Sequence, residues 1–157
     1  MRSVADLRVK IFADGADLRG MLDMYRNPLI SGFTTNPTLM RKAGIADYRA
    51  FARDVLAAIP DRPISFEVFA DDPVEMERQA REIAGWGPSV YVKIPVTNTA
   101  GAPTYELIHT LSNDGLQLNV TALMTLDVWV LGRVRTGPFF VLLERAATPA
   151  ASARRAS

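Results

Sequence analysis

The chain has 157 residues, of which 48% are hydrophobic, with ten glycines, ten prolines and no cysteine. This composition predicts one compact soluble domain. The absence of cysteine excludes a disulfide framework and thiolate chemistry, and a single histidine argues against a His-rich metal site or a Ser-His-Asp triad. No apolar run approaches the roughly 18 residues of a membrane span, and the N-terminus lacks the apolar region of a signal peptide. We therefore expect a cytoplasmic protein without a membrane partner. An eight-unit β/α barrel usually needs about 200 to 250 residues, more than this chain has.

The near-neutral net charge of +1 hides an uneven distribution. Residues 1–127 carry a net charge of −3, whereas residues 128–157 carry five arginines against one glutamate, or +4. We predict a domain over 1–127 and a basic, irregular tail over 128–157. Five arginines scattered among Ala and Pro are a weak footprint for nucleic acid or anionic lipid, so neither is an expected partner.

In chain order, short β-rich runs alternate with helical patterns. The predicted strands are Val9–Ala13, Leu29–Thr34, Ile64–Ala70, Val90–Val96 and Leu116–Met124. Apolar residues at helical spacing predict helices over about 18–25, 46–59, 73–84 and 103–111, and a further helix should begin near Thr125. Five strands separated by helices indicate an α/β fold built of βα units around a parallel sheet.

Polar residues inside these strands are informative, because strands covered on both faces are usually apolar throughout. Asp14 closes the first run, Glu67 interrupts the third and Lys93 interrupts the fourth. Asn119 and Thr121 lie in the fifth run and, two residues apart, share one face. If these faces meet, a lysine, two carboxylates, an amide and a hydroxyl converge.

Such a set has a chemical use. A lysine in a water-poor pocket loses solvation of its ammonium form, so a neutral amine becomes available to attack a carbonyl and form a Schiff base. The iminium then accepts electrons from the neighbouring carbon–carbon bond as it breaks. A carboxylate can take the proton of the departing hydroxyl, and a carboxylate with a hydroxyl can hold a water that relays protons.

Each residue also has a structural interpretation. Asp14, before a glycine, suits a turn or helix N-cap, and Asn36, before Pro37, suits an N-cap. Glu67 and Lys93 suit an ion pair at a strand end. The polar groups of the fifth run can also be buried hydrogen-bonding residues.

Five motifs in this order resemble those of the transaldolase family, which includes the fructose-6-phosphate aldolases. They are FAD at 12–14, GFTTNPT at 32–38, SFEV at 65–68, VKIPVT at 92–97 and LNVTAL at 118–123. The resemblance covers about residues 9–127. It implies the first five βα units of a (β/α)8 TIM barrel, incomplete in this chain.

The resemblance also implies roles for four catalytic residues. Lys93 matches the Schiff-base lysine, and Asp14 matches the acid/base that acts on the hydroxyl of the departing aldehyde. Glu67 and Thr121 match the pair that holds the catalytic water.

Substrate contacts are implied for three more residues. Asn36 matches the residue that hydrogen-bonds the sugar, with Thr34 and Asn119 beside the site. No metal and no organic cofactor are implied, and the expected partners are small sugar phosphates, with a homo-oligomer as a further expectation.

The implied reaction transfers a dihydroxyacetone unit from fructose 6-phosphate to erythrose 4-phosphate, a step of the pentose phosphate pathway. Two alternatives stay open, namely a class I aldolase that cleaves fructose 6-phosphate and a non-catalytic half-barrel remnant. In the aldolase relatives a glutamine commonly stands where this chain has Glu67, which favours the transferase. Residues 128–157 do not resemble the later βα units that bind the substrate phosphate, so we expect a truncated or frameshifted member whose activity is impaired.

Overall fold

The computed structural model describes residues 10–122 and 139–141. Its strands are β1 (Ile11–Gly15), β2 (Ile30–Thr35), β3 (Ile64–Glu67), β4 (Val90–Pro95), β5 (Leu118–Thr121) and β6 (Phe139–Val141). Its helices are α1 (Leu18–Tyr25), α2 (Pro37–Lys42), α3 (Tyr48–Ala58), α4 (Pro73–Ala84) and α5 (Tyr105–Asn113). The five predicted strands and four predicted helices are confirmed, with ends that differ by a few residues.

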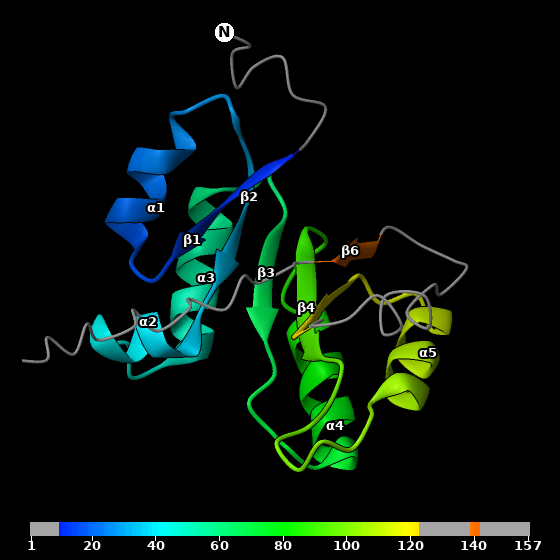
Figure 1. The fold of residues 1–157 in the computed structure, drawn as a ribbon. Helices are drawn as coiled ribbons and strands as arrows, with labels where there is room; N and C mark the ends of the chain where they lie inside the picture. Colours follow the sequence, from blue (N-terminus) through cyan, green and yellow to red (C-terminus); the bar gives the residue numbers. More distant parts are fainter. Residues whose placement is uncertain (1–9, 123–138, 142–157) are drawn as a thin grey trace, which may run out of the picture.

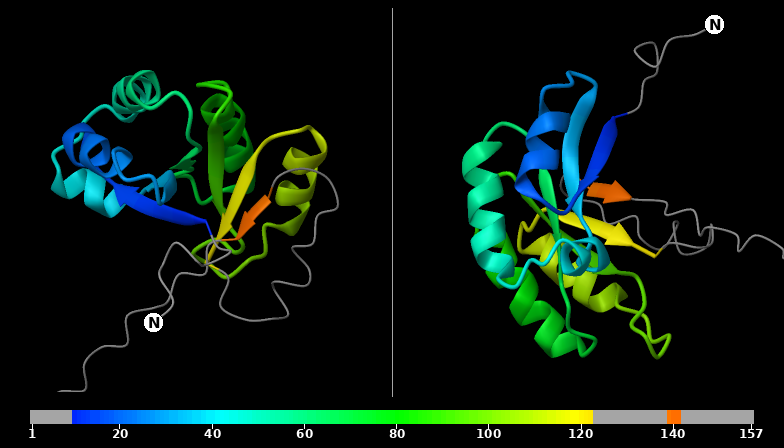
Figure 2. Two further views of the ribbon diagram at one scale, coloured as in Figure 1. Left: turned by 90° about the horizontal axis from the view of Figure 1, so that it is seen from above. Right: turned by 90° about the vertical axis from the view of Figure 1, so that its left-hand side faces the viewer.

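The six strands form one sheet in the order β1-β2-β3-β4-β5-β6, and every neighbouring pair is parallel (Figure 1). Viewed from above, the sheet is curled, and the helices lie along the outside of the curve (Figure 2). A curled parallel sheet with helices on its outer face is the arrangement of an incomplete (β/α) barrel. The predicted fold class is therefore confirmed.

Polar residues before the helices determine where these helices begin. Asp17, Asp47 and Asp72 each accept hydrogen bonds from backbone N–H groups in the first turn of α1, α3 and α4. Pro73 follows its cap at the first helical position, where a missing N–H costs nothing. The starts of α1, α3 and α4 are therefore determined by their own sequences, whereas Thr104 before α5 makes no side-chain cap hydrogen bond.

Contacts on the outer face show which side chains point to the helices. A Cβ on Gly15 would overlap the side chain of Met21 on α1, so this glycine faces outward. Phe66 of β3 packs edge-to-face against Tyr48 of α3 and Trp86, with ring centroids 5.9 and 5.5 Å apart. Because side chains alternate along a strand, the neighbours of these residues point into the curl.

Gly32 allows a close packing inside the curl. A Cβ there would overlap the ring of Phe12 on β1 and lie 2.7 Å from the carbonyl oxygen of Pro63. No side chain fits this position without movement of the backbone, so glycine leaves room for the Phe12 ring on the inner face of the sheet.

Two elements were not predicted. Helix α2 follows β2 directly and is only six residues long. Strand β6 lies in the segment 128–157, for which an irregular chain was expected, and its three residues pair in parallel with β5. The rest of that segment, and the helix predicted to begin near Thr125, lie outside the described residues. Within the described ranges, no helix is long and apolar enough to cross a membrane.

Candidate active site

Lys93 lies at the centre of the polar group inside the curl. Lys93 is only 2% exposed, and its Nζ atom donates a hydrogen bond of 3.1 Å to the carbonyl oxygen of Thr35 on β2. The same Nζ lies 3.4 Å from Oε2 of Glu67 on β3. The β-sheet register places Glu67 opposite Lys93, so the ion pair expected from the sequence is confirmed.

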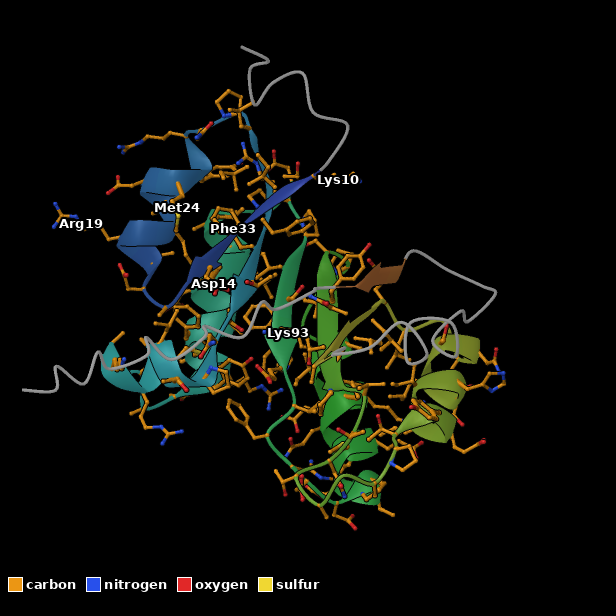
Figure 3. The ribbon with its side chains drawn as sticks, in the orientation of Figure 1. Lys10, Asp14, Arg19, Met24, Phe33 and Lys93 are labelled. Carbon is orange, nitrogen blue, oxygen red and sulfur yellow. The ribbon has the colours of Figure 1, made fainter. Side chains whose placement is uncertain are left out.

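Asp14 and Thr34 form a second polar pair, on β1 and β2. The Thr34 hydroxyl donates a short hydrogen bond to Oδ1 of Asp14, and the register places these residues side by side. Asp14 lies within β1 and is solvent-exposed, whereas the cap of α1 is Asp17, so the N-cap interpretation of Asp14 is wrong. Figure 3 shows Asp14 and Lys93 on β1 and β4, with β2 and β3 between them.

Asn119 and Thr121 on β5 are both buried. Asn119 lies in register with Lys93, and its Nδ2 donates to the Ser65 hydroxyl at 3.1 Å. Its Oδ1 is buried with no hydrogen-bond partner among the described residues. Thr121 follows two residues later on the same face, in register with Pro95.

Asn36 acts as the N-cap of α2, as its structural interpretation predicted. Its Oδ1 accepts hydrogen bonds from the backbone N–H groups of Thr38 at 2.8 Å and Leu39 at 3.3 Å. The cap holds Asn36 at the carboxyl end of β2, immediately after the carbonyl that accepts from Lys93.

Three polar residues of the site were not predicted, namely Thr35, Ser65 and Tyr48. Ser65 precedes Glu67 by two positions, so the alternation of side chains along a strand could have indicated it. Thr35 contributes its backbone carbonyl, which no sequence pattern indicates. Tyr48 comes from α3, and its hydroxyl accepts the backbone N–H of Glu67 at 2.8 Å.

The arrangement places an amine, two carboxylates, an amide and several hydroxyls on the inner face of one curled sheet. In the ranges that the structure describes, no three His, Cys, Asp or Glu side chains gather closely enough to hold a metal ion. The groups present suit covalent chemistry at a carbonyl, with the amine as nucleophile and carboxylates as proton carriers.

Fold and site together define an incomplete β/α barrel with a buried lysine on the inner face of its sheet. A sequence profile described as "Transaldolase/Fructose-6-phosphate aldolase" matches residues 11–131. The chain belongs to this family.

Curated relatives agree with the family match. A "Probable transaldolase" of Dehalococcoides mccartyi is 39% identical over 131 residues, which cover 83% of this chain and 59% of that protein. A protein of the same name from Streptococcus agalactiae serotype V is 35% identical over 146 residues, covering 90% of this chain and 65% of that protein. One from Roseiflexus castenholzii is 36% identical over 133 residues, covering 85% and 58%. The chain thus spans about three fifths of the length of these relatives.

Proposed function

We propose that this site forms a Schiff base between Lys93 and a ketose phosphate and transfers a dihydroxyacetone unit to an aldose phosphate. The donor would be fructose 6-phosphate and the acceptor erythrose 4-phosphate, as in the pentose phosphate pathway of the cytoplasm. The observation that carries the proposal is the buried amine of Lys93, held between Glu67 and a backbone carbonyl.

Lysine is almost never fully buried unless it is paired, and Lys93 is held by Glu67 with its amine on the inner face of the curl, where it can meet a carbonyl substrate. In the proposed reaction, Nζ attacks C2 of the ketose, water leaves, and an iminium forms. The C3–C4 bond then breaks, its electron pair moves into the iminium to give an enamine, and the aldehyde departs. Attack of the enamine on the acceptor aldehyde, followed by hydrolysis, releases the product and restores the amine.

Two carboxylates would move the protons. Asp14 is exposed to solvent and paired with the Thr34 hydroxyl, so it can accept the proton of the C4 hydroxyl as the aldehyde leaves. Glu67 contacts the amine itself, and with Thr121 it would hold the water used in imine formation and hydrolysis. These roles separate proton transfer at the substrate from proton transfer at the lysine.

Substrate contacts are proposed for Asn119, Asn36 and Thr34. The buried Oδ1 of Asn119 lies on the strand beside Lys93 and can accept a hydrogen bond from a sugar hydroxyl. Asn36 uses its Oδ1 as the cap of α2, so its contribution to the sugar would come from the amide nitrogen.

A class I aldolase, releasing free dihydroxyacetone, is the second candidate for the same site. Its first step also uses the lysine, so the observation that favours it is the same buried amine. The carboxylate at Glu67 supports the transferase, because the resemblance places a glutamine there in the aldolases.

Borohydride trapping tests the proposal. The purified chain is incubated with fructose 6-phosphate and sodium borohydride, and its intact mass is measured. We expect one covalent adduct, absent when Lys93 is replaced by methionine. Release of glyceraldehyde 3-phosphate is then measured with and without erythrose 4-phosphate. Release beyond one equivalent per chain only with the acceptor supports the transferase, and continued release without it supports the aldolase. A parent chain that forms no adduct contradicts both and leaves the remnant hypothesis.

A further inference from the structure

The hydrogen-bond ladder between β2 and β3 ends one step before the active site. Phe33 donates its backbone N–H to the carbonyl oxygen of Pro63, and the paired register continues only through Thr34 opposite Ser65. In a regular parallel ladder the next bond would join the backbone N–H of Glu67 to the carbonyl oxygen of Thr35. That bond is replaced by two others.

The first replacement partner is the hydroxyl of Tyr48, which accepts the N–H of Glu67 at 2.8 Å. The second is the amine of Lys93, which donates to the carbonyl oxygen of Thr35 at 3.1 Å. Tyr48 thus receives the strand N–H that Thr35 would otherwise accept. The carbonyl of Thr35 is thereby available to the lysine.

We propose that Tyr48 is a positioning residue for Lys93: its hydroxyl ends the β2–β3 ladder and so keeps the Thr35 carbonyl for the amine. The inference rests on the proposed function only in taking Lys93 as the nucleophile. Its physical content is that a Thr35 carbonyl which accepted Glu67 N–H would offer Lys93 Nζ only its second lone pair, and so a weaker hydrogen bond.

The Tyr48 hydroxyl also has an acceptor for its own proton, the hydroxyl of Thr35. The Thr35 hydroxyl donates to the carbonyl oxygen of Ser65 at 3.0 Å, so it can accept from Tyr48 at 3.3 Å. Burial raises the pKa of the Tyr48 phenol to about 12, so it stays protonated at neutral pH and both donates and accepts.

The ring of Tyr48 is fixed by three edge-to-face aromatic contacts. Its centroid lies 5.9 Å from Phe66, 4.8 Å from Phe69 and 5.4 Å from Trp86. Phenylalanine can keep these contacts, so Tyr48→Phe removes the hydroxyl and little else. A matched control is Tyr25→Phe, which removes an exposed hydrogen bond to Asp61 on the far side of the sheet from the lysine.

Reductive methylation with formaldehyde and cyanoborohydride tests the inference without any substrate. The rate at Lys93 is divided by that at the exposed Lys42 in the same molecule, from peptide masses, across a range of pH. Among the described residues, Glu67 on β3 is the charged group within ion-pair distance of Lys93. Asp14 on β1 faces the same interior. Both remain in the variant.

In Tyr48→Phe we expect Glu67 N–H to close onto the Thr35 carbonyl, so that the amine shares this acceptor and its own hydrogen bond weakens. The Lys93-to-Lys42 ratio near neutral pH then rises by about tenfold, the usual effect of one hydrogen bond to a charged group. The Lys93 profile moves to lower pH, while Tyr25→Phe matches the parent.

A Tyr48→Phe protein with the parental ratio and profile overturns the inference, whatever its melting temperature, because a purely structural role would change stability alone. Should that variant not fold, Thr35→Val removes the hydroxyl that takes the phenol proton and keeps the Thr35 carbonyl. We expect the ratio to rise there too, and an unchanged ratio overturns the inference. Failure of the proposed function is seen separately, as a parent chain that fructose 6-phosphate does not trap.

Discussion

The Lys93–Glu67 pair gives an asymmetric prediction for stability. Glu67→Gln removes one charge and leaves the ammonium of Lys93, 2% exposed, without its counter-ion. Lys93→Met removes the buried charge itself, and the remaining carboxylate of Glu67 keeps water because its side chain is 25% exposed. We therefore expect the two single changes to have unequal costs.

The size of the effect follows from the geometry. Opposite charges separated by the Nζ–Oε2 distance of 3.4 Å attract by about 5 kcal/mol at an effective dielectric constant of about 20. Solvent at the partly exposed glutamate screens this attraction. We expect Glu67→Gln to lower the free energy of unfolding by about 2 to 3 kcal/mol. Lys93→Met should stay within about 1 kcal/mol of the parent or exceed it.

Urea unfolding at pH 7, followed by tryptophan fluorescence, measures both variants and their combination. In the double variant most of the Glu67→Gln penalty should disappear, because no buried ammonium is left. A Lys93→Met protein that loses as much stability as Glu67→Gln refutes the reasoning. That result would mean that the buried lysine stabilises the folded state, whereas we expect its burial to be destabilising.

Three further predictions concern other residues. Gly32→Ala should lower the free energy of unfolding by about 1 to 3 kcal/mol, because the new Cβ would lie 2.7 Å from a backbone oxygen. At the control position, a Cβ on Gly87 would make only ordinary contacts, so Gly87→Ala should change the free energy of unfolding by less than about 1 kcal/mol. Equal unfolding midpoints in urea would contradict this. Asn36→Asp keeps the cap oxygen and should keep the parental melting temperature, whereas Asn36→Ala should lower the free energy of unfolding by about 1 kcal/mol. If the amide nitrogen binds the sugar, both variants should trap less fructose 6-phosphate. Undiminished trapping by Asn36→Asp would contradict that role. Hydrogen bonds from the backbone N–H and the hydroxyl of Thr99 hold the pKa of the Asp71 carboxyl below its ordinary value of 3.8. The stability that these bonds add is therefore fully present above the ordinary pKa and is lost as the pH falls through the lower pKa of the folded state. Asp71→Asn should therefore lose less stability than the parent between about pH 5 and pH 3, and identical acid unfolding curves would contradict the assignment.

Much of the fold was predictable because its signals are local. Alternating β-rich runs and helical spacings identified five strands and four helices. Asp72 followed by Pro73 marked the start of α4, as observed. Helix α2 was missed although Asn36 was named as a cap, because six residues after it are too few to show a helical period. Strand β6 was missed although Phe139, Phe140 and Val141 favour strands, because residues 128–157 were judged irregular from their overall Arg- and Ala-rich composition.

The site was predictable where its signal is a charge inside an apolar strand. Lys93 and Glu67 stood out on that ground, and the structure brings them together. The acceptor of Lys93 is a backbone carbonyl, and backbone groups leave no trace in a sequence. Tyr48 begins α3 and reaches β3 only through tertiary packing, so a tyrosine among apolar helix residues gave no indication of its partner.

Peptide mapping of the borohydride-trapped chain tests the central claim most directly. The chain has three lysines, Lys10, Lys42 and Lys93, of which the first two are exposed. After reaction with fructose 6-phosphate and borohydride, we expect the added mass on the peptide that contains Lys93 and unmodified masses on the other two. An adduct shared equally among the three lysines, or found only on the exposed pair, would contradict the assignment of Lys93 as the Schiff-base residue.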